Sequence, residues 1–389
     1  TSKLIDGICF TGSTKIAKLI NKNSVSKGNP YVSLIAETGG INAMIVDSTA
    51  LPEQAVKDIL ASSFQSAGQR CSALRMLYIQ EDIANNFLEM LFGAMDELII
   101  DDPWSANTDI GPIISSSAAK DIKKYIDLAI VNNRVLHQVK IPTQGSFVKP
   151  TVIKVKSITD LKKEIFGPVL HVATFKAGDI SRIVNDINNT GYGLTFGIHS
   201  RIDARIHYLC ENLNIGNIYV NRNQIGAVVG SQPFGGEGLS GTGPKAGGPS
   251  YLYQFIKDDD VKTYNYNDKN TTLENAQLLI DDCSQIGRKV LNSTSLPGPT
   301  GESNILSTYP KGVILCLGPT KNIAEIQAEY VRKNGSIACI ILGLSLRNLQ
   351  ELKNFSAVIL SSSAENVRDA KKALADRNGN IIPLITNAK

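Results

Sequence analysis

The sequence of 389 residues lacks any apolar run near the ~18–20 residues that a bilayer-spanning helix needs. Its six cysteines include no C-x-x-C pair, and its four histidines show no metal-site spacing. We therefore expect reduced thiols and no bound metal. The net charge is only +4, from 40 basic and 36 acidic residues, so nothing indicates a nucleic-acid or anionic-membrane partner. No signal segment follows Thr1, and we expect a cytoplasmic protein.

Hydrophobic residues make up 42% of the chain and charged residues 20%, which is ordinary for a globular protein of two or three domains. The segment Leu4–Phe10, a helical pattern after Gly12 and the segment Tyr31–Ala36 predict a βαβ unit. The other expected helices are Gln54–Ser63, Asp82–Leu98, Ala118–Asn132, Leu273–Leu291, Ile323–Lys333 and Glu365–Ala375. The other expected strands are Phe147–Val155, Val169–Phe175, Leu194–Ile198, Asn217–Val220, Val261–Tyr266, Gly312–Leu317, Ile337–Leu342, Val358–Leu360 and Ile381–Ile385, and Gln232–Pro249 is expected to be a loop.

Cys71 stands in the segment Gly68-Gln69-Arg70-Cys71-Ser72, with Arg75 close behind it. A lone cysteine is most often a small buried hydrophobe. Positive charge nearby, or the N-terminus of a following helix, favours the thiolate, which is the nucleophile that attacks carbonyl carbons. The sequence therefore offers Cys71 as a candidate nucleophile.

Glu37 ends an expected strand and precedes Gly39 and Gly40. The simplest interpretation is an exposed carboxylate at a strand end. The two glycines, however, allow a close approach of the backbone to a ligand. A carboxylate at the carboxyl end of a parallel sheet could then act as a general base.

Four motifs in this order resemble those of the aldehyde dehydrogenase superfamily. Glu37-Thr38-Gly39-Gly40 and Cys71 resemble its base and nucleophile, and Phe10-Thr11-Gly12-Ser13 its pyrophosphate-binding turn. Glu164-Ile165-Phe166-Gly167-Pro168 resembles its ribose and nicotinamide motif, and Pro233-Phe234-Gly235-Gly236 its late substrate loop. Further segments resemble the Δ1-pyrroline-5-carboxylate dehydrogenase portion and the C-terminal domain of the bifunctional proline utilization A family; these are Ala36–Gly40, Asn42–Gln54, Gly68–Arg75, Gly226–Pro249 and Ser293–Asn304.

The resemblance implies an α/β fold: an aldehyde dehydrogenase-like catalytic domain with the last βαβ unit of a Rossmann-type NAD domain, followed by a smaller α/β domain. The expected division is residues 1–40 as a remnant of the NAD domain and 41–255 as the catalytic domain. Residues 256–270 would be an edge strand and linker, and 271–389 a C-terminal domain without cofactor.

The implied reaction is the oxidation of L-glutamate γ-semialdehyde to L-glutamate with NAD, the second step of proline catabolism. Cys71 would form the thioacyl intermediate, and Glu37 would activate water. The implied substrate-binding residues are Ser72, Gly226, Ala227 and Phe234, and the implied cofactor-binding residues are Thr11, Gly12, Ser13, Gly39, Glu164 and Phe166. Ser72 as a helix cap, Phe234 as core and Glu164 as a solvated charge are the structural alternatives.

Ile41 replaces a glutamine common in this family, and the family's catalytic asparagine and ribose-binding lysine have no counterpart in this sequence. The resemblance therefore implies a fragment truncated at the N-terminus and also short at the C-terminus. Its parent would carry a proline dehydrogenase module with FAD and form a homo-oligomer. The isolated fragment is expected to be inactive, and a scaffold or the product of a split or decaying gene is the alternative function.

The segment Leu317-Gly318-Pro319-Thr320 resembles the earlier Phe10-Thr11-Gly12-Ser13 turn. The similarity could be chance, or the third region could be a diverged copy of a dinucleotide-binding unit. Pro319 has no backbone N–H for a phosphate, so we expect no cofactor there. The resemblance implies that this region helps to enclose a passage between two active sites.

Overall fold

The computed structural model describes residues 4–27, 29–256, 264–266, 271–283 and 290–386. The chain divides into two compact units, residues 39–226 and residues 1–38 with 227–389, and each is described by itself. The domain boundaries expected from the sequence remain a prediction. The expected strand at Val261–Tyr266 lies partly outside the described residues.

Residues 39–226, all of which the structure describes, form a doubly wound unit around a sheet in the order β10-β9-β3-β4-β7-β6-β5. Neighbouring strands are parallel except β5 and β6. The strands are β3 (Asn42–Val46), β4 (Leu74–Gln80), β5 (Val135–Gln138), β6 (Thr151–Lys154), β7 (Val169–Phe175), β8 (Tyr192–Gly193), β9 (Thr195–His199) and β10 (Asn217–Val220). The helices are α2 (Pro52–Phe64), α3 (Ala84–Asp96), α4 (Ser116–Val131), α5 (Ile180–Asn189) and α6 (Asp203–Asn212).

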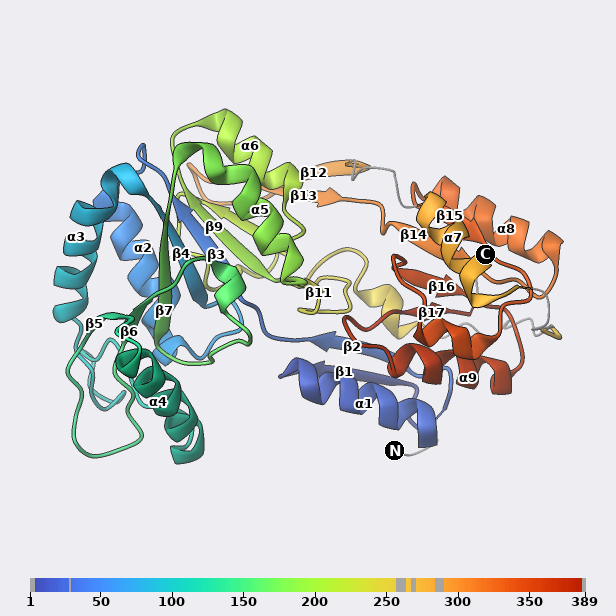
Figure 1. Ribbon diagram of the computed structural model, residues 1–389, viewed down its shortest axis with the longest axis horizontal. Coiled ribbons are helices and arrows are strands. Elements are labelled where there is room, and N and C mark those ends of the chain that lie inside the picture. Colours follow the sequence, from blue (N-terminus) through green and yellow to red (C-terminus); the bar gives the residue numbers. More distant parts are fainter. Residues whose placement is uncertain (1–3, 28, 257–263, 267–270, 284–289, 387–389) are drawn as a thin grey trace. The chain divides into compact units, whose positions relative to one another are not determined.

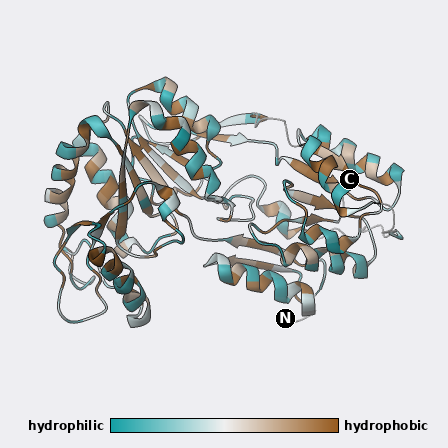
Figure 2. Cartoon of the chain, in the orientation of Figure 1, coloured by the Kyte–Doolittle hydropathy of each residue, from teal (hydrophilic) through white to brown (hydrophobic). Residues whose placement is uncertain are grey.

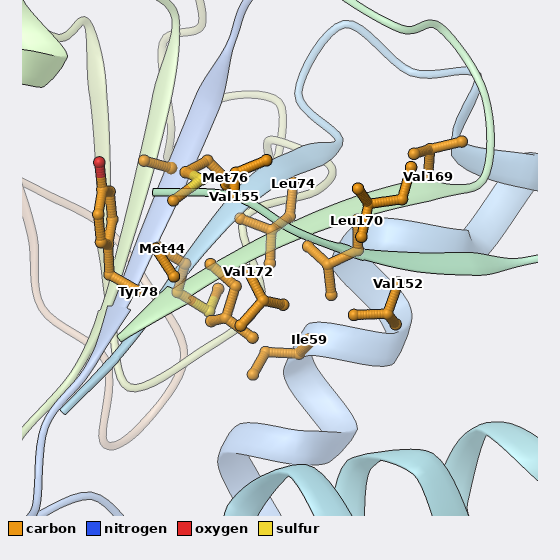
Figure 3. Close-up of a cluster of buried hydrophobic side chains, with 14 of the residues drawn as sticks. Met44, Ile59, Leu74, Met76, Tyr78, Val152, Val155, Val169, Leu170 and Val172 are labelled. Carbon is orange, nitrogen blue, oxygen red and sulfur yellow. The ribbon is translucent and has the colours of Figure 1, made fainter. Parts of the chain in front are cut away.

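Helices α2 and α3 lie on one side of this sheet, and α5 and α6 lie on the other (Figure 1). Every residue of β3, β4 and β9 is therefore buried. This explains why these strands read as nearly continuous apolar runs instead of alternating ones. Ile59 of α2 packs with Met44, Leu74 and Val172 in the core (Figure 3), and the covering helices have one apolar and one polar side (Figure 2).

The other unit begins with the expected βαβ arrangement. Strand β1 (Gly7–Thr11) leads into α1 (Thr14–Lys27), and β2 (Ser33–Glu37) pairs parallel to β1. Its C-terminal part has a parallel sheet in the order β15-β14-β16-β17 among the described residues. The remaining elements are β11 (Glu237–Gly238), α7 (Leu273–Cys283), β12 (Asn292–Leu296), β13 (Asn304–Thr308), β14 (Val313–Cys316), α8 (Lys321–Lys333), β15 (Ile337–Ile340), β16 (Ala357–Ile359), α9 (Ala364–Ala375) and β17 (Leu384–Ile385).

Some expectations about elements are wrong. The helix expected at Leu273–Leu291 is described only to Cys283, and Leu291 directly precedes β12, which pairs antiparallel with β13. The long strand expected at Phe147–Val155 is only β6, because Phe147–Pro150 approach it as irregular chain. The expectations omitted β3 and β4 as strands and α5 and α6 as helices.

Helix α9 packs against α1 within the same unit. Arg368 donates from Nη1 to the carbonyl oxygen of Val25 at 2.8 Å, and Lys371 donates from Nζ to that of Val32 at 3.1 Å. Lys22 and Asp376 form an exposed ion pair at 2.9 Å. The C-terminal region thus supports the βαβ unit through cations that satisfy backbone carbonyls, one of them near the C-terminus of α1.

Candidate functional site

Cys71 lies in a turn whose backbone is unusual. The three residues Ser66, Ala67 and Gly68 have φ angles of 55°, 54° and 65°, in the left-handed region. A Cβ at Gly68 would lie 2.2 Å from the carbonyl oxygen of Gly167, so only glycine fits there. Such a backbone persists only where the surroundings hold it, and it is typical of functional sites.

Side chains from neighbouring strands hold the carbonyl groups of this turn. Asn42 donates from Nδ2 to the carbonyl oxygens of Cys71 (2.7 Å) and Ala73 (2.9 Å). The carbonyl oxygen of Ser72 accepts from Thr195 Oγ1 at 3.1 Å and from Gln224 Nε2 at 3.3 Å. The carbonyl groups around Cys71 are therefore fixed before any substrate arrives.

The half-buried Cys71 is followed by a strand and not by a helix. The sequence-based alternative of a helix cap at Ser72 is therefore wrong, and no helix dipole follows the thiol. Of the two nearby arginines, Arg70 donates from Nε to the Ser66 hydroxyl at 3.0 Å. Arg75 is buried, and its guanidinium interacts electrostatically with the Cys71 sulfur.

Glu164 forms an ion pair with Arg75, from Nη2 to Oε1 at 3.0 Å. Burial raises the pKa of the Glu164 carboxyl, opposed by Arg75 and by a hydrogen bond from the Gly40 backbone. A Cβ at position 39 would lie 1.9 Å from Glu164 Oε2, so Gly39 leaves the space that this carboxylate fills. The alternative of a solvated Glu164 is therefore wrong, since only 16% of its side chain is exposed.

Phe166 is 45% exposed, and the Arg75 guanidinium carbon lies 5.4 Å from its ring centroid. An exposed aromatic ring with one face towards a buried cation is fixed in place yet free to contact a ligand on its other side.

These residues share one edge of the sheet. Gly39 and Gly40 directly precede β3, Cys71 precedes β4, and the Glu164–Gly167 segment precedes β7. The three strands are neighbours and parallel, so their amino ends meet at the same edge. The structure thus brings together Gly39, Cys71, Ser72, Glu164 and Phe166 at this edge.

Glu37 lies in the other unit, at the carboxyl end of β2. Its Oε2 accepts from the Gly236 backbone N–H at 2.9 Å, whereas its buried Oε1 has no hydrogen-bond donor among the described residues. Burial raises the pKa of Glu37 to about 7, opposed by the Gly236 hydrogen bond and by Lys245. A carboxylate with one uncommitted oxygen and a near-neutral pKa is suited to take a proton from water.

Glycines surround this carboxylate. A Cβ at Gly241 would lie 2.9 Å from Oε1, and one at Gly235 would lie 3.3 Å from it. The loop around 235–241 therefore closes over Glu37 only because those positions lack side chains. The motif Pro233-Phe234-Gly235-Gly236 contains two of these glycines, but the sequence did not predict their contact with Glu37. The repeated glycines of the loop are the sequence signal for this contact.

Thr11, Gly12 and Ser13 form an exposed turn from β1 into α1. The Ser13 carbonyl oxygen accepts from the Ile16 and Ala17 N–H groups at 3.0 Å each, and Ser13 Oγ accepts weakly from Ile16 at 3.3 Å. Ser13 is thus the N-cap of α1, and this turn stands at the carboxyl end of a parallel strand.

The remaining expected substrate residues lie in or beside a long irregular loop. Gly226 is exposed with φ 74°, which permits its turn, and Ala227 follows it half-buried. Phe234 is half-buried and exchanges backbone hydrogen bonds with Ala246 at 3.0 and 2.8 Å. The structure therefore does not make Phe234 an ordinary core residue.

In the described residues, no group of three or more His, Cys, Asp and Glu side chains is arranged to hold a metal ion. Across the same residues, no helix is both long enough and apolar enough to cross a membrane.

The fold is that of an α/β protein: one doubly wound unit carries the cysteine turn, and the βαβ arrangement of the other unit ends at the half-buried Glu37. The aldehyde dehydrogenase family model matches residues 1–261. The chain therefore belongs to the aldehyde dehydrogenase family.

The chain is also similar to particular curated proteins. It is 40% identical to the bifunctional protein PutA of Klebsiella aerogenes over 97% of this chain and 33% of that protein. It is 38% identical to the 1-pyrroline-5-carboxylate dehydrogenase of a Geobacillus species over 65% of this chain and 50% of that protein. The chain thus spans about a third of the length of its PutA relatives.

The chain is also similar to solved structures of proteins with these names. A Bradyrhizobium japonicum proline utilization A mutant is 50% identical with a TM-score of 0.64, over 65% of this chain and 26% of that one. A Thermus 1-pyrroline-5-carboxylate dehydrogenase with bound NAD is 32% identical with a TM-score of 0.60, over 65% of this chain and 50% of that one. Both similarities support the α/β aldehyde dehydrogenase fold.

Proposed function

We propose that this chain carries the catalytic portion of an NAD-dependent dehydrogenase that oxidises L-glutamate γ-semialdehyde to L-glutamate. Two groups carry the proposal: Cys71 in a rigid turn, and Glu37 with a pKa of about 7 and one oxygen that has no hydrogen-bond donor in the described part of the chain. The substrate assignment rests on relatives named PutA and 1-pyrroline-5-carboxylate dehydrogenase.

In the proposed reaction, the Cys71 sulfur attacks the aldehyde carbon, and a C–S bond forms as the carbonyl oxygen becomes negative. The Cys71 backbone N–H would stabilise that oxygen. NAD, when bound, supplies the hydride acceptor that converts this adduct to a thioester. Glu37 then takes a proton from water, the water oxygen attacks the thioester carbon, and the C–S bond breaks to release glutamate and the thiolate.

The substrate contacts are proposed from the motif match and the loop geometry. Ser72, with the backbone groups of Gly226 and Ala227, would hold the far carboxylate of the semialdehyde. Phe234 would pack on its aliphatic middle. The left-handed Gly226 supports this role, because such a turn presents backbone N–H groups to an anion.

The residues present fit a dinucleotide. Thr11, Gly12 and Ser13 form an exposed turn at a helix N-terminus, where backbone N–H groups favour a pyrophosphate. Phe166 offers an exposed ring to the nicotinamide. Glu164 would accept hydrogen bonds from the ribose hydroxyls, and the absence of a Cβ at Gly39 gives its carboxylate room beside the backbone.

The test measures NADH formation from glutamate semialdehyde by the native full-length protein. Cys71→Ser should abolish it, whereas Glu37→Gln should give one burst of NADH and then stop with Cys71 acylated. Cys210→Ser is the matched control and should turn over normally. A wild-type protein without turnover would contradict the proposal and favour the alternative of a catalytically incomplete scaffold.

We also propose that the native polypeptide includes a proline dehydrogenase module, the only part that would bind FAD, and that it forms a homo-oligomer in the cytoplasm. The 97% coverage of this chain by PutA relatives of about three times its length supports the module. The mass of the native polypeptide, its flavin absorbance and its light scattering in solution test these points. A native polypeptide of 389 residues would contradict the module.

A further inference from the structure

Arg75 is the most deeply buried charged side chain near the cysteine turn, with 1% of it exposed. Burial lowers its pKa, and the charge of Glu164 opposes that effect. A buried guanidinium is costly unless its N–H groups are bonded. The two terminal nitrogens of Arg75 meet this requirement with four acceptors, whereas its buried Nε has no hydrogen-bond acceptor among the described residues. The four bonds fix the position of the guanidinium.

The four acceptors belong to two different segments. In the cysteine turn, Arg75 Nη1 donates to the carbonyl oxygen of Gly68 at 2.7 Å, and Nη2 donates to that of Arg70 at 3.1 Å. In the Glu164–Gly167 segment, Nη1 donates to the carbonyl oxygen of Gly167 at 3.1 Å, and Nη2 to Glu164 Oε1 at 3.0 Å.

The two segments also meet directly at Gly68, which has no room for a side chain against Gly167. Arg75 itself is the second residue of β4, at the point where the register with β3 shifts. Its backbone carbonyl oxygen is held by His171 Nδ1 of β7 at 2.8 Å. The guanidinium therefore joins two loops from the rigid sheet between them. A lysine has a similar charge but cannot donate to four acceptors in this planar arrangement.

We propose that Arg75 is a positioning residue for the Cys71 nucleophile. Arg75 fixes the cysteine turn and, by its ion pair with Glu164, connects this turn to the segment that contacts the cofactor. This inference rests on the proposed function for the roles of Cys71 and Glu164. Arg75 itself does not touch the reacting atoms. It holds the carbonyls that precede Cys71, while Asn42 holds those of Cys71 and Ala73.

The electrostatic part of the proposal concerns Glu164. The Arg75 guanidinium favours negative charge on the Cys71 sulfur, and the paired Glu164 carboxylate partly cancels that field. Hydrogen bonds from the ribose hydroxyls to this carboxylate would partly neutralise its charge and so weaken the cancellation. Cofactor binding would thus favour the Cys71 thiolate through this pair.

The decisive experiment measures the rate of Cys71 alkylation by iodoacetamide against pH in the full-length protein, with peptide mapping. Arg75→Lys should slow alkylation at neutral pH at least tenfold while the far-ultraviolet circular dichroism is retained. Arg70→Lys is the matched control, because Arg70 adjoins Cys71 but its side chain bonds the Ser66 hydroxyl, through Nε, and takes no part in the contacts of Arg75. It should react like wild type.

Glu164→Ala is the second variant, and it decides the question if Arg75→Lys does not fold. In the absence of NAD, the pH profile of Cys71 alkylation in Glu164→Ala should shift to lower pH than in the wild type. The same substitution made in the Arg75→Lys variant should give a smaller shift. Unchanged profiles in Arg75→Lys, or in Glu164→Ala, would overturn the inference. Alkylation requires no turnover. A wild-type protein without dehydrogenase activity would contradict the proposed function, but the alkylation profiles of the variants would still test the role of Arg75.

Discussion

The carboxyl of Glu37 shows how burial prepares a single residue. One oxygen is bonded to the Gly236 N–H and the other is buried without a donor among the described residues. A fully bonded carboxylate would have a low pKa and be a weak base, whereas this one has a pKa of about 7. Such a group changes protonation within the physiological range.

We expect hydrolysis of the acyl-enzyme to rise with pH through about 7, because only the ionised Glu37 accepts a proton. The folded pKa lies above the ordinary value of 4.5, so this group's contribution to the free energy of unfolding is full below pH 4.5 and is lost as pH rises through about 7. Lys245→Met should move the acid limb of the hydrolysis rate to higher pH, because Lys245 favours the ionised form. A limb that stays in place would contradict this.

Ser72 provides a prediction about substrate choice. Ser72→Ala should weaken use of glutamate semialdehyde by ~1.5–3 kcal/mol, the cost of a lost hydrogen bond to a charged group, and spare short uncharged aldehydes. The Ser72 carbonyl contacts to Thr195 and Gln224 involve only the backbone and should survive. The ratio of kcat/KM for the two substrates is the measurement. Equal losses on both would mean that Ser72 supports Cys71 instead.

At the scale of elements, the β12–β13 hairpin holds the long loop that carries Ala227 and Phe234. Gln232 Nε2 donates to Glu302 Oε1 at 2.6 Å and to Asn304 Oδ1 at 3.2 Å. Its Oε1 accepts from the Val228 N–H at 3.1 Å. One amide thus fixes the loop to the hairpin and also closes a turn within the loop.

Gln232→Ala should therefore loosen this loop while the sheet of residues 39–226 stays intact. We expect cleavage between 226 and 249 in limited proteolysis to accelerate several-fold, with a higher KM for the semialdehyde. Gln254→Ala, at a glutamine outside this network, is the control. Proteolysis at the wild-type rate would show that the hairpin does not restrain the loop.

At the scale of the whole chain, two strand–turn–helix units carry the similar turns noted in the sequence. The first joins β1 to α1 and the second joins β14 to α8. In the second, the Gly318 N–H donates to Gln327 Oε1 at 3.0 Å, and Pro319 has no N–H.

NAD should accordingly protect only the first turn. In hydrogen exchange of the full-length protein, saturating NAD should slow amide exchange within 11–17 and leave 317–324 unchanged. Ser13→Pro, which removes the N–H of the α1 N-cap, should weaken NAD binding in calorimetry. Protection at 317–324 would contradict the expectation that residues 271–389 carry no cofactor.

The sequence by itself determined the elements whose patterns are local. The βαβ unit follows from two short apolar runs and a glycine turn, and β7 and β10 lie where the pattern placed them. The motifs around Glu37 and Cys71 could also be recognised from the sequence, because a nucleophile and a base require particular residue types. Their roles, and the domain boundaries, remain predictions.

Only the tertiary structure decided how these groups are held. The sequence showed Arg75 only as a positive charge near Cys71. In the structure it is buried and bonds both the cysteine turn and the Glu164–Gly167 segment. The pKa of Glu37 depends on the glycine loop at 235–241, which lies about 200 positions away in the chain and covers and bonds its carboxyl. Desolvation and hydrogen-bond geometry depend on what surrounds a group in space, and a local sequence pattern does not contain that information.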